Sequence, residues 1–123
     1  MKILIDTHIF LWAVYEPQKI SKPHYEELQS LSNTVFVSSI SLVEIIIKNS
    51  IGKLTIDANL IKLVEDSGFE LLSFKAHDAI KLKDIPLHHK DPFDRMLIAQ
   101  ALNNNYRMMS NDEKFKQYDC KLA

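Results

Sequence analysis

Several acidic side chains in this sequence stand where apolar segments begin or end, and together they have the chemistry of a metal site. Asp6 ends the run KILID, Glu44 lies inside SLVEIIIK, Asp91 and Asp94 lie on either side of a Pro-Phe pair, and Asp112 follows YRMMSN. Carboxylate oxygens are the ligands that Mg²⁺ and Mn²⁺ prefer in proteins. Acidic residues are also common helix caps, so each of these side chains has a structural interpretation as well.

Asp6 and Asp112 each follow a short segment with the composition of a β-strand. Asp6 either faces a ligand-binding crevice beyond its strand or caps a helix over the next run, THIFLWAV, and the sequence favours neither interpretation. For Asp112 taken alone, capping of the following turn by Ser110 or Asp112 itself is the simpler interpretation. His8 and Trp12, inside THIFLWAV, are expected in the core or in the wall of the crevice.

Glu44 is the least expected of these acids because apolar residues precede and follow it. A carboxylate in such a segment is costly to bury unless it is paired, hydrogen-bonded or bound to a cation. A capping box with Ser41 is the structural alternative. If Ser38 or Ser39 caps the helix instead, Glu44 lies a full turn inside it and the box fails. We favour a functional role.

The segment DPFDRMLIAQAL contains two acids at the start of the clearest predicted helix. Proline favours the first helical position, so Asp91 is the natural N-cap. Asp94 then occupies the third helical position, where Glu or Gln would reach back to the cap more readily than the shorter Asp. We predict that Asp91 starts the helix and that Asp94 points into a crevice.

Segments of strand composition alternate with helical segments along the chain, which predicts an α/β fold with a mostly parallel sheet. Asp57 is expected to cap one helix, and Gly52 and Gly68 are expected to end two of them. In parallel sheets, sites lie beyond the carboxyl ends of the strands. Strands are predicted at 2–6, 34–38, 69–74, 106–110 and 120–122, helices at 22–31, 39–52, 57–68, 75–82 and 91–105, and a helical turn at 112–118.

Length and composition fit one domain over residues 1–123 that buries a single sizeable core, with 46% hydrophobic and 25% charged residues. The net charge of −1 lacks the basic excess usual in nucleic-acid binders. The single cysteine, Cys120, rules out a disulfide within the chain and fits the cytoplasm. No run approaches the roughly 20 apolar residues of a membrane helix, and the three apolar residues Ile3–Ile5 near the N-terminus are too few for the core of a signal peptide.

Four acids follow a common rule, because each lies at a strand end or early in the next helix: Asp6, Glu44, Asp94 and Asp112. They are therefore expected to share one pocket. Clustered carboxylates repel one another unless they are protonated or neutralised, and Mg²⁺ or Mn²⁺ is the economical neutraliser. A histidine metal site at His88 and His89 is not favoured, because the pair lies in a predicted loop without a helical HxxxH spacing.

The segments ILIDTHIFLWA, SSISLVEIIIKNSIGKL, HKDPFDRMLIAQAL and MSNDEKFKQY occur in an order and spacing that resembles the PIN-domain family, and most closely its VapC-type toxins. The resemblance covers nearly the whole chain. It implies a three-layer α/β/α sandwich with a short, mostly parallel sheet, a metal-dependent ribonuclease site, a cognate antitoxin and a homodimer. Val43 and Lys90 depart from the pattern, which often has an aromatic residue and an arginine there.

By the same resemblance, the four metal-binding and catalytic acids match Asp6, Glu44, Asp94 and Asp112. Ser110 matches a small hydroxyl residue that orders the site, and Asp91 remains an accessory acid. The expected reaction is hydrolysis of RNA phosphodiester bonds with Mg²⁺ or Mn²⁺. A basic rim for RNA would draw on residues near the motifs: Lys48, Lys53, Lys90, Arg95, Lys114 and Lys116.

Three alternatives remain: an aspartyl-phosphate phosphatase, a receiver-like signalling domain and an inactive PIN relative. Phosphatases of that kind resemble D-x-D-x-T, whereas here Asp6 is followed by Thr7 and His8. A receiver would want paired acids near the first strand. The presence of all four acids argues against an inactive relative.

Overall fold

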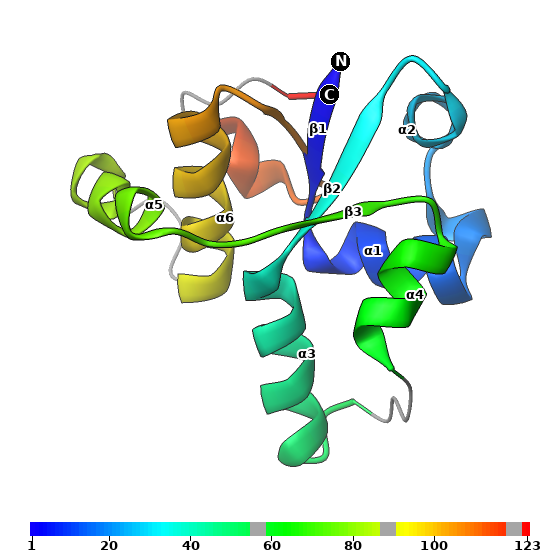
Figure 1. Cartoon of the computed structure of the whole chain (residues 1–123), viewed down its shortest axis with the longest axis horizontal. Coiled ribbons are helices and arrows are strands. Elements are labelled where there is room, and N and C mark those ends of the chain that lie inside the picture. Colours follow the sequence, from blue (N-terminus) through cyan, green and yellow to red (C-terminus); the bar gives the residue numbers. More distant parts are fainter. Residues whose placement is uncertain (55–58, 87–90, 118–121) are drawn as a thin grey trace.

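Four short parallel strands form the central sheet in the described part of the chain (Figure 1). The structure is a computed structural model that describes residues 1–54, 59–86, 91–117 and 122–123. The strand order is β3-β2-β1-β4, so β1 lies inside the sheet. The strands are β1 (Lys2–Ile5), β2 (Thr34–Ser38), β3 (Glu70–Leu72) and β4 (Arg107–Met109).

Side-chain alternation along the strands creates a hydrophobic core on each face of the sheet. Ile3 and Ile5 belong to one buried cluster, whereas Leu4 between them belongs to the other. On β2, Val37 belongs to the same cluster as Ile3 and Ile5, and Phe36 belongs to the same cluster as Leu4. This alternation arises because successive strand residues point to opposite faces of the sheet. All three residues of β1 named here are fully buried, as expected for a parallel sheet covered on both sides.

Helices cover both faces and complete three layers. Helices α1 and α4 contribute Phe10 and Val64 to the cluster with Ile3, and α6 contributes Leu97 and Ile98 to the other cluster. The predicted α/β/α sandwich is therefore confirmed. The helices are α1 (Thr7–Tyr15), α2 (Lys22–Gln29), α3 (Ser39–Ser50), α4 (Leu60–Asp66), α5 (Ala76–Lys81) and α6 (Pro92–Asn104), with 3₁₀ turns η1 (Pro17–Lys19), η2 (Leu82–Asp84) and η3 (Glu113–Gln117).

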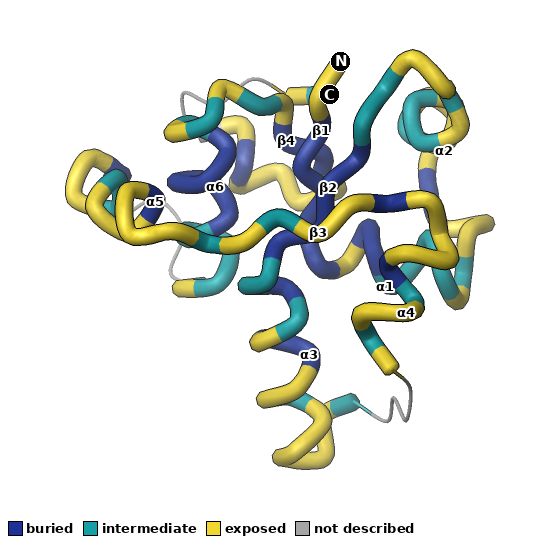
Figure 2. The backbone as a smooth tube through the Cα atoms, viewed as in Figure 1, coloured by how far each residue is buried: buried dark blue, intermediate teal, exposed yellow. Residues whose placement is uncertain are grey.

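Buried residues concentrate in β1, β2 and α6, whereas the far end of α3 is exposed (Figure 2). Helix α3 extends from the carboxyl end of β2 and ends before Gly52, which has a φ of 77°. Gly68 follows α4 with a φ of 78°. Both glycines occupy the left-handed region that a helix terminus requires, so these two predicted helix ends are confirmed.

The structure corrects several predicted boundaries. Helix α4 begins at Leu60, and its N-cap is Asn59, whose Oδ1 accepts from the Lys62 N–H at 3.2 Å. The predicted cap Asp57 lies outside the described residues. Strand β3 is shorter than the predicted 69–74 segment. Most of the predicted 120–122 strand also lies outside the described residues, although Leu122 forms a parallel bridge with Met108.

The path of the chain defines where a site can form. The chain runs outward from β1 through β2 to β3 and then returns to β4 on the other side of β1. The carboxyl ends of β1 and β4 therefore lie at the point where the strand order reverses, which is the usual ligand position in open parallel sheets. Asp6 directly follows β1 and Ser110 directly follows β4. None of the described helices has both the length and the apolar composition of a membrane span.

Candidate active site

Asp6 is held at the end of β1 by bonds from two different parts of the chain. Its Oδ1 accepts from the Ile9 N–H at 2.8 Å, which makes Asp6 the N-cap of α1. Its Oδ2 accepts from the Ser110 hydroxyl at 2.6 Å, and its own N–H donates to the Met109 carbonyl at 3.0 Å. Asp6 can therefore cap α1 and also bind a ligand, because each of its carboxylate oxygens keeps a second lone pair.

Glu44 is buried inside α3, with only 2% of its surface exposed. The N-cap of α3 is Ser38, so Glu44 lies a full turn inside the helix and the capping box with Ser41 is excluded. Instead, Glu44 Oε1 accepts from the Thr7 hydroxyl at 2.7 Å, and Oε2 is bonded to Lys48 Nζ at 2.6 Å. The Thr7 hydroxyl from α1 and the Lys48 ammonium one turn further along α3, rather than capping, therefore compensate this buried charge.

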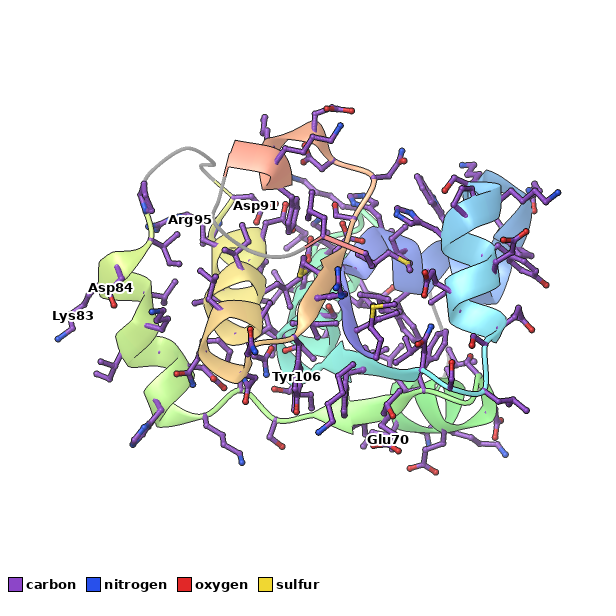
Figure 3. The ribbon with its side chains drawn as sticks, turned by 90° about the horizontal axis from the view of Figure 1, so that it is seen from above. Glu70, Lys83, Asp84, Asp91, Arg95 and Tyr106 are labelled. Atoms are coloured by element: carbon purple, nitrogen blue, oxygen red, sulfur yellow. The ribbon has the colours of Figure 1, made fainter. Side chains whose placement is uncertain are left out.

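Asp91 caps α6, as its position before Pro92 predicts. Its Oδ1 accepts from the N–H groups of Phe93 at 2.9 Å and Asp94 at 3.3 Å. Figure 3 shows Asp91 at the amino end of α6, opposite the end near Tyr106. Asp94 follows in the first turn, where the helix dipole favours negative charge.

Electrostatics connect the acids from the different motifs. The pKa of Asp94 is raised to about 8, first by burial and then by the negative charges of Asp91, Asp6, Glu44 and Asp112, in that order. Burial also raises the pKa of Asp6, although the hydrogen bonds from Ser110 and Ile9 oppose that rise. Side chains separated by most of the chain length therefore repel one another around one half-buried position.

Asp112 has both the capping role and a position in the crevice. Its Oδ1 accepts from the Lys114 N–H at 2.9 Å at the start of η3, and its own N–H donates to the Ser110 hydroxyl at 3.0 Å. Asp112 also lines a hollow of about 230 Å³ together with Asp6. Ser110 thus links Asp6 to Asp112 through one hydroxyl group.

The described carboxylates do not form a preformed metal-coordination site. Among the residues that the structure describes, no three His, Cys, Asp or Glu side chains are arranged to hold a metal ion. Both Glu44 oxygens are already bonded to Thr7 and Lys48. The donor chemistry still fits a hard dication, because the pKa of Asp94 is raised by burial first and then by nearby negative charges, and a bound cation would offset those charges. Mg²⁺ is commonly bound by one or two carboxylates plus water and substrate phosphates.

The basic residues near the motifs are mostly paired with protein groups. Lys48 bonds Glu44, and its pKa is raised by that hydrogen bond first and also by the charges of Asp91 and Asp94. Lys116 pairs with Glu113 at 2.9 Å, and Arg95 donates to the Ile85 carbonyl at 3.1 Å. The structure therefore gives no continuous basic rim among these three residues. Lys90, a further predicted rim residue, lies outside the described residues, and so do His88 and His89.

Two site residues were missed as such by the sequence reasoning. Thr7 donates to Glu44 from the first position of α1, and nothing in the sequence indicates this contact across 37 positions. Lys48 was considered only for the rim, although its i,i+4 spacing from Glu44 is the signature of a helical ion pair.

Comparison with known proteins gives a consistent result. The family model described as PIN domain matches residues 3–121. A structure of VapBC2 from Rickettsia felis bound to a promoter DNA fragment is similar over 100% of this chain and 98% of that chain, with a TM-score of 0.76 and 20% identity. DNA-bound VapBC from Salmonella typhimurium is similar over 100% and 97%, with a TM-score of 0.72 and 18% identity.

The PIN domain endonuclease Utp24 is a more distant structural neighbour, with a TM-score of 0.53 and 21% identity. The similarity covers 94% of this chain and 74% of that chain. No curated protein sequence matches this chain.

We predict that Asp94→Asn changes how stability depends on pH in the absence of divalent ions. The folded-state pKa of Asp94 is about 8, whereas an unfolded Asp has a pKa of about 3.9. Between these values the folded state binds more protons than the unfolded chain, so the free energy of unfolding falls as pH rises from about 4 to 8. The variant lacks this loss and should gain stability relative to the parent protein as pH rises.

Urea denaturation in EDTA at pH 5, 7 and 9 measures this effect. Asp66→Asn is the matched control, because the Asp66 side chain is 63% exposed on α4. Parallel pH profiles for the parent protein and Asp94→Asn would contradict the prediction.

We predict that Lys48→Met tightens the binding of Mn²⁺. Lys48 places a positive charge 2.6 Å from a Glu44 oxygen, so it competes electrostatically with a dication for the same acids. Removing one unit charge a few ångströms away in a solvated setting is worth about 1 kcal/mol, or about fivefold in affinity. Isothermal titration calorimetry on metal-free protein measures the change.

Lys62→Met is the control for this substitution. It also breaks an i,i+4 ion pair, with Asp66 at 3.6 Å, but on the exposed face of α4. Weaker Mn²⁺ binding by a normally folded Lys48→Met variant would show instead that Lys48 holds Glu44 in place for the metal.

Proposed function

Because the chain belongs to the PIN domain family, we propose that it is a VapC-type toxin, a Mg²⁺- or Mn²⁺-dependent endoribonuclease that acts in the cytoplasm. The family match agrees with the resemblance found in the sequence motifs. The observation that supports the activity best is the mutual repulsion of acids from four motifs at the carboxyl edge of the sheet. We treat residues 1–123 as one nuclease domain.

Asp6 and Asp94 are the proposed direct metal ligands. Asp6 is oriented by Ile9 and Ser110, and Asp94 carries the raised pKa that a bound cation would lower. When bound, the dication would neutralise these carboxylates, acidify a water molecule and stabilise charge on the phosphate oxygens. Glu44 and Asp112 complete the proposed catalytic and metal-binding set, and Asp91 is an accessory acid that fixes the start of α6.

The chain's own residues would position the reactants. Asp112, next to Asp6 in the same hollow, is placed to accept a hydrogen bond from the attacking water. Lys48 pairs with Glu44 at 2.6 Å and would bring a positive charge near the substrate phosphate. By family resemblance, attack of water on phosphorus would leave a 5′-phosphate and a 3′-hydroxyl.

An antitoxin partner and a homodimer are part of this proposal. The similar structures from Rickettsia felis and Salmonella typhimurium contain VapBC, which supports a protein inhibitor for this chain too. Helix α3 and its C-cap carry apolar side chains at 40% exposure or more, namely Val43, Ile46, Ile47 and the cap residue Ile51, so this region has surface available for a partner. Light scattering of the purified chain should give twice the monomer mass of 14.2 kDa, and a monomer at all concentrations would contradict the dimer.

We predict that Asp6→Asn and Asp94→Asn each slow RNA cleavage on the order of 100-fold or more. Each substitution removes a charge that the metal and the transition state require. Purified protein is incubated with total RNA and with single-stranded oligonucleotides in Mg²⁺, Mn²⁺ or excess EDTA, and product ends are mapped by labelling. Asp66→Asn is the control for an acid outside the site.

Cleavage that continues in EDTA, or equally in both variants, would overturn the proposed mechanism. A folded protein that cleaves no RNA in either metal would identify the chain as an inactive relative. Binding of beryllofluoride at Asp6 would indicate the phosphatase or receiver chemistry instead, because both proceed through an aspartyl phosphate.

A further inference from the structure

A hollow of about 230 Å³ opens directly beside the proposed catalytic acids. It is lined by Asp6 and Asp112 on the side of the acids, and by His8, Trp12 and Asn111. Its walls come from the first turns of α1 and from the segment after β4, so it lies at the same switch point of the sheet as Asp6. A group that enters this hollow would thus lie next to the reacting centre.

Two aromatic rings form one wall of the hollow. His8 and Trp12 are four residues apart on α1, so they lie on the same face of the helix. Their ring centres are 6.3 Å apart, with an interplanar angle of 46°. Trp12 also packs against the hydrophobic cluster that contains Ile9 and Phe10. One part of the indole is therefore anchored in the core while another part faces the hollow, which makes it a rigid stacking platform.

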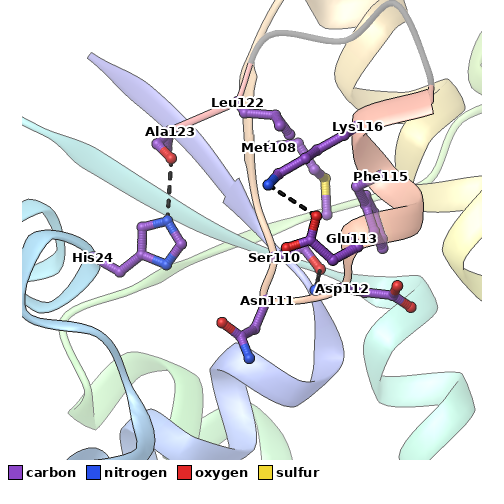
Figure 4. A pocket seen from close by; sticks show the side chains of 10 residues that line it. All are labelled: His24, Met108, Ser110, Asn111, Asp112, Glu113, Phe115, Lys116, Leu122 and Ala123. Carbon is purple, nitrogen blue, oxygen red and sulfur yellow. Dashed lines mark hydrogen bonds and ion pairs between the residues drawn. The ribbon is translucent and has the colours of Figure 1, made fainter.

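Asn111 supplies polar recognition on the opposite wall. In Figure 4 its side chain extends toward the helix that follows β1. Within the described ranges, neither the Asn111 amide nor the Trp12 indole N–H makes a side-chain hydrogen bond. An amide presents donors and an acceptor together, which is the pattern that pairs with the edge of a nucleobase. The wall thus combines a π surface with hydrogen-bonding groups.

A positive charge lies near the aromatic wall. Lys19 Nζ is 6.0 Å from the centre of the Trp12 ring, and the same ammonium pairs with Glu16 at 3.1 Å. This cation lies beside the Trp12 ring, and it gives a neighbouring phosphate an attractive partner.

We propose that His8, Trp12 and Asn111 form a subsite for one unstacked nucleobase of single-stranded RNA, adjacent to the phosphate that is cleaved. The inference rests on the proposed ribonuclease function and adds what the enzyme reads in its substrate. Trp12 stacks on the base, Asn111 bonds its polar edge, and Asp6 and Asp112 lie on the side where the backbone phosphate meets the acids. Duplex RNA does not fit this arrangement, because a paired base is not free to enter.

Trp12 is the only tryptophan in the chain, so its fluorescence reports directly on this subsite. We expect short unstructured RNA oligonucleotides, added with Ca²⁺ in place of Mg²⁺, to quench the emission. Oligonucleotides of the same length with abasic positions should not quench it and should bind about tenfold more weakly, the usual scale of base–aromatic stacking. Fluorescence anisotropy of labelled oligonucleotides gives the affinities.

Variants separate stacking from general binding. Trp12→Leu should weaken binding about tenfold, whereas Trp12→Phe should retain most of the affinity because it keeps a ring. Tyr15→Leu is the matched control, since Tyr15 is a 51% exposed aromatic residue on the same helix that does not line the hollow. Asn111→Ala should reduce the differences in affinity among oligonucleotides of A, C, G and U.

The outcomes distinguish the subsite from the enzyme. If the parent protein cleaves RNA but abasic oligonucleotides bind as tightly as intact ones, and intact oligonucleotides leave the Trp12 emission unchanged, the subsite is wrong and the nuclease stands. If it neither binds nor cleaves RNA, both proposals fall. Circular dichroism shows whether the Trp12→Leu variant is folded. If the variant is unfolded, the comparison of intact with abasic RNA on the parent protein still tests the subsite.

Discussion

Negative charge at the carboxyl edge of a buried parallel sheet is the constraint on which the rest of this structure depends. Asp6 is 3% exposed and Glu44 is 2% exposed, so neither carboxylate can rely on bulk water for its solvation. The protein supplies substitutes: backbone N–H groups, the hydroxyls of Thr7 and Ser110, and the Lys48 ammonium. These groups come from α1, α3 and the segment after β4, so the site and the packing of these elements require one another.

These substitutes offset the charge unevenly. Each Glu44 oxygen accepts one hydrogen bond, from Thr7 or from Lys48, whereas Asp94 lies in a position where its pKa is raised to about 8. An unfavourable electrostatic environment of this kind is expected where a bound ligand completes the charge balance. At such positions a protein is less stable than it could be, because the residues serve function. The same reasoning explains why an ammonium and a dication would both be attracted to this edge of the sheet.

The residues around the acids fall into two groups, one that bonds the charged centre and one that lines the adjoining hollow. Helix α1 begins with the N-cap Asp6 and the hydroxyl of Thr7, which serve the charged centre, and continues with His8 and Trp12, which line the adjoining hollow. Ser110 and Asp112 join the two regions from the other side. A short stretch after β1 and a short stretch after β4 thus provide both the chemistry and the space next to it, because these two strands are neighbours in the sheet.

The sequence by itself determined much of this protein. Alternating strand and helix segments predicted the layered α/β fold, and Asp91 before Pro92 predicted the start of α6, because these features depend on local geometry and periodicity. Acids at the strand ends indicated a shared edge, since parallel strands end on one side. Tertiary structure alone decided that β1 lies between β2 and β4, that Ser38 rather than Ser41 caps α3, and that Thr7 bonds Glu44. Strand order and contacts across many positions depend on how buried faces pack together, and no local pattern in a single sequence encodes that packing.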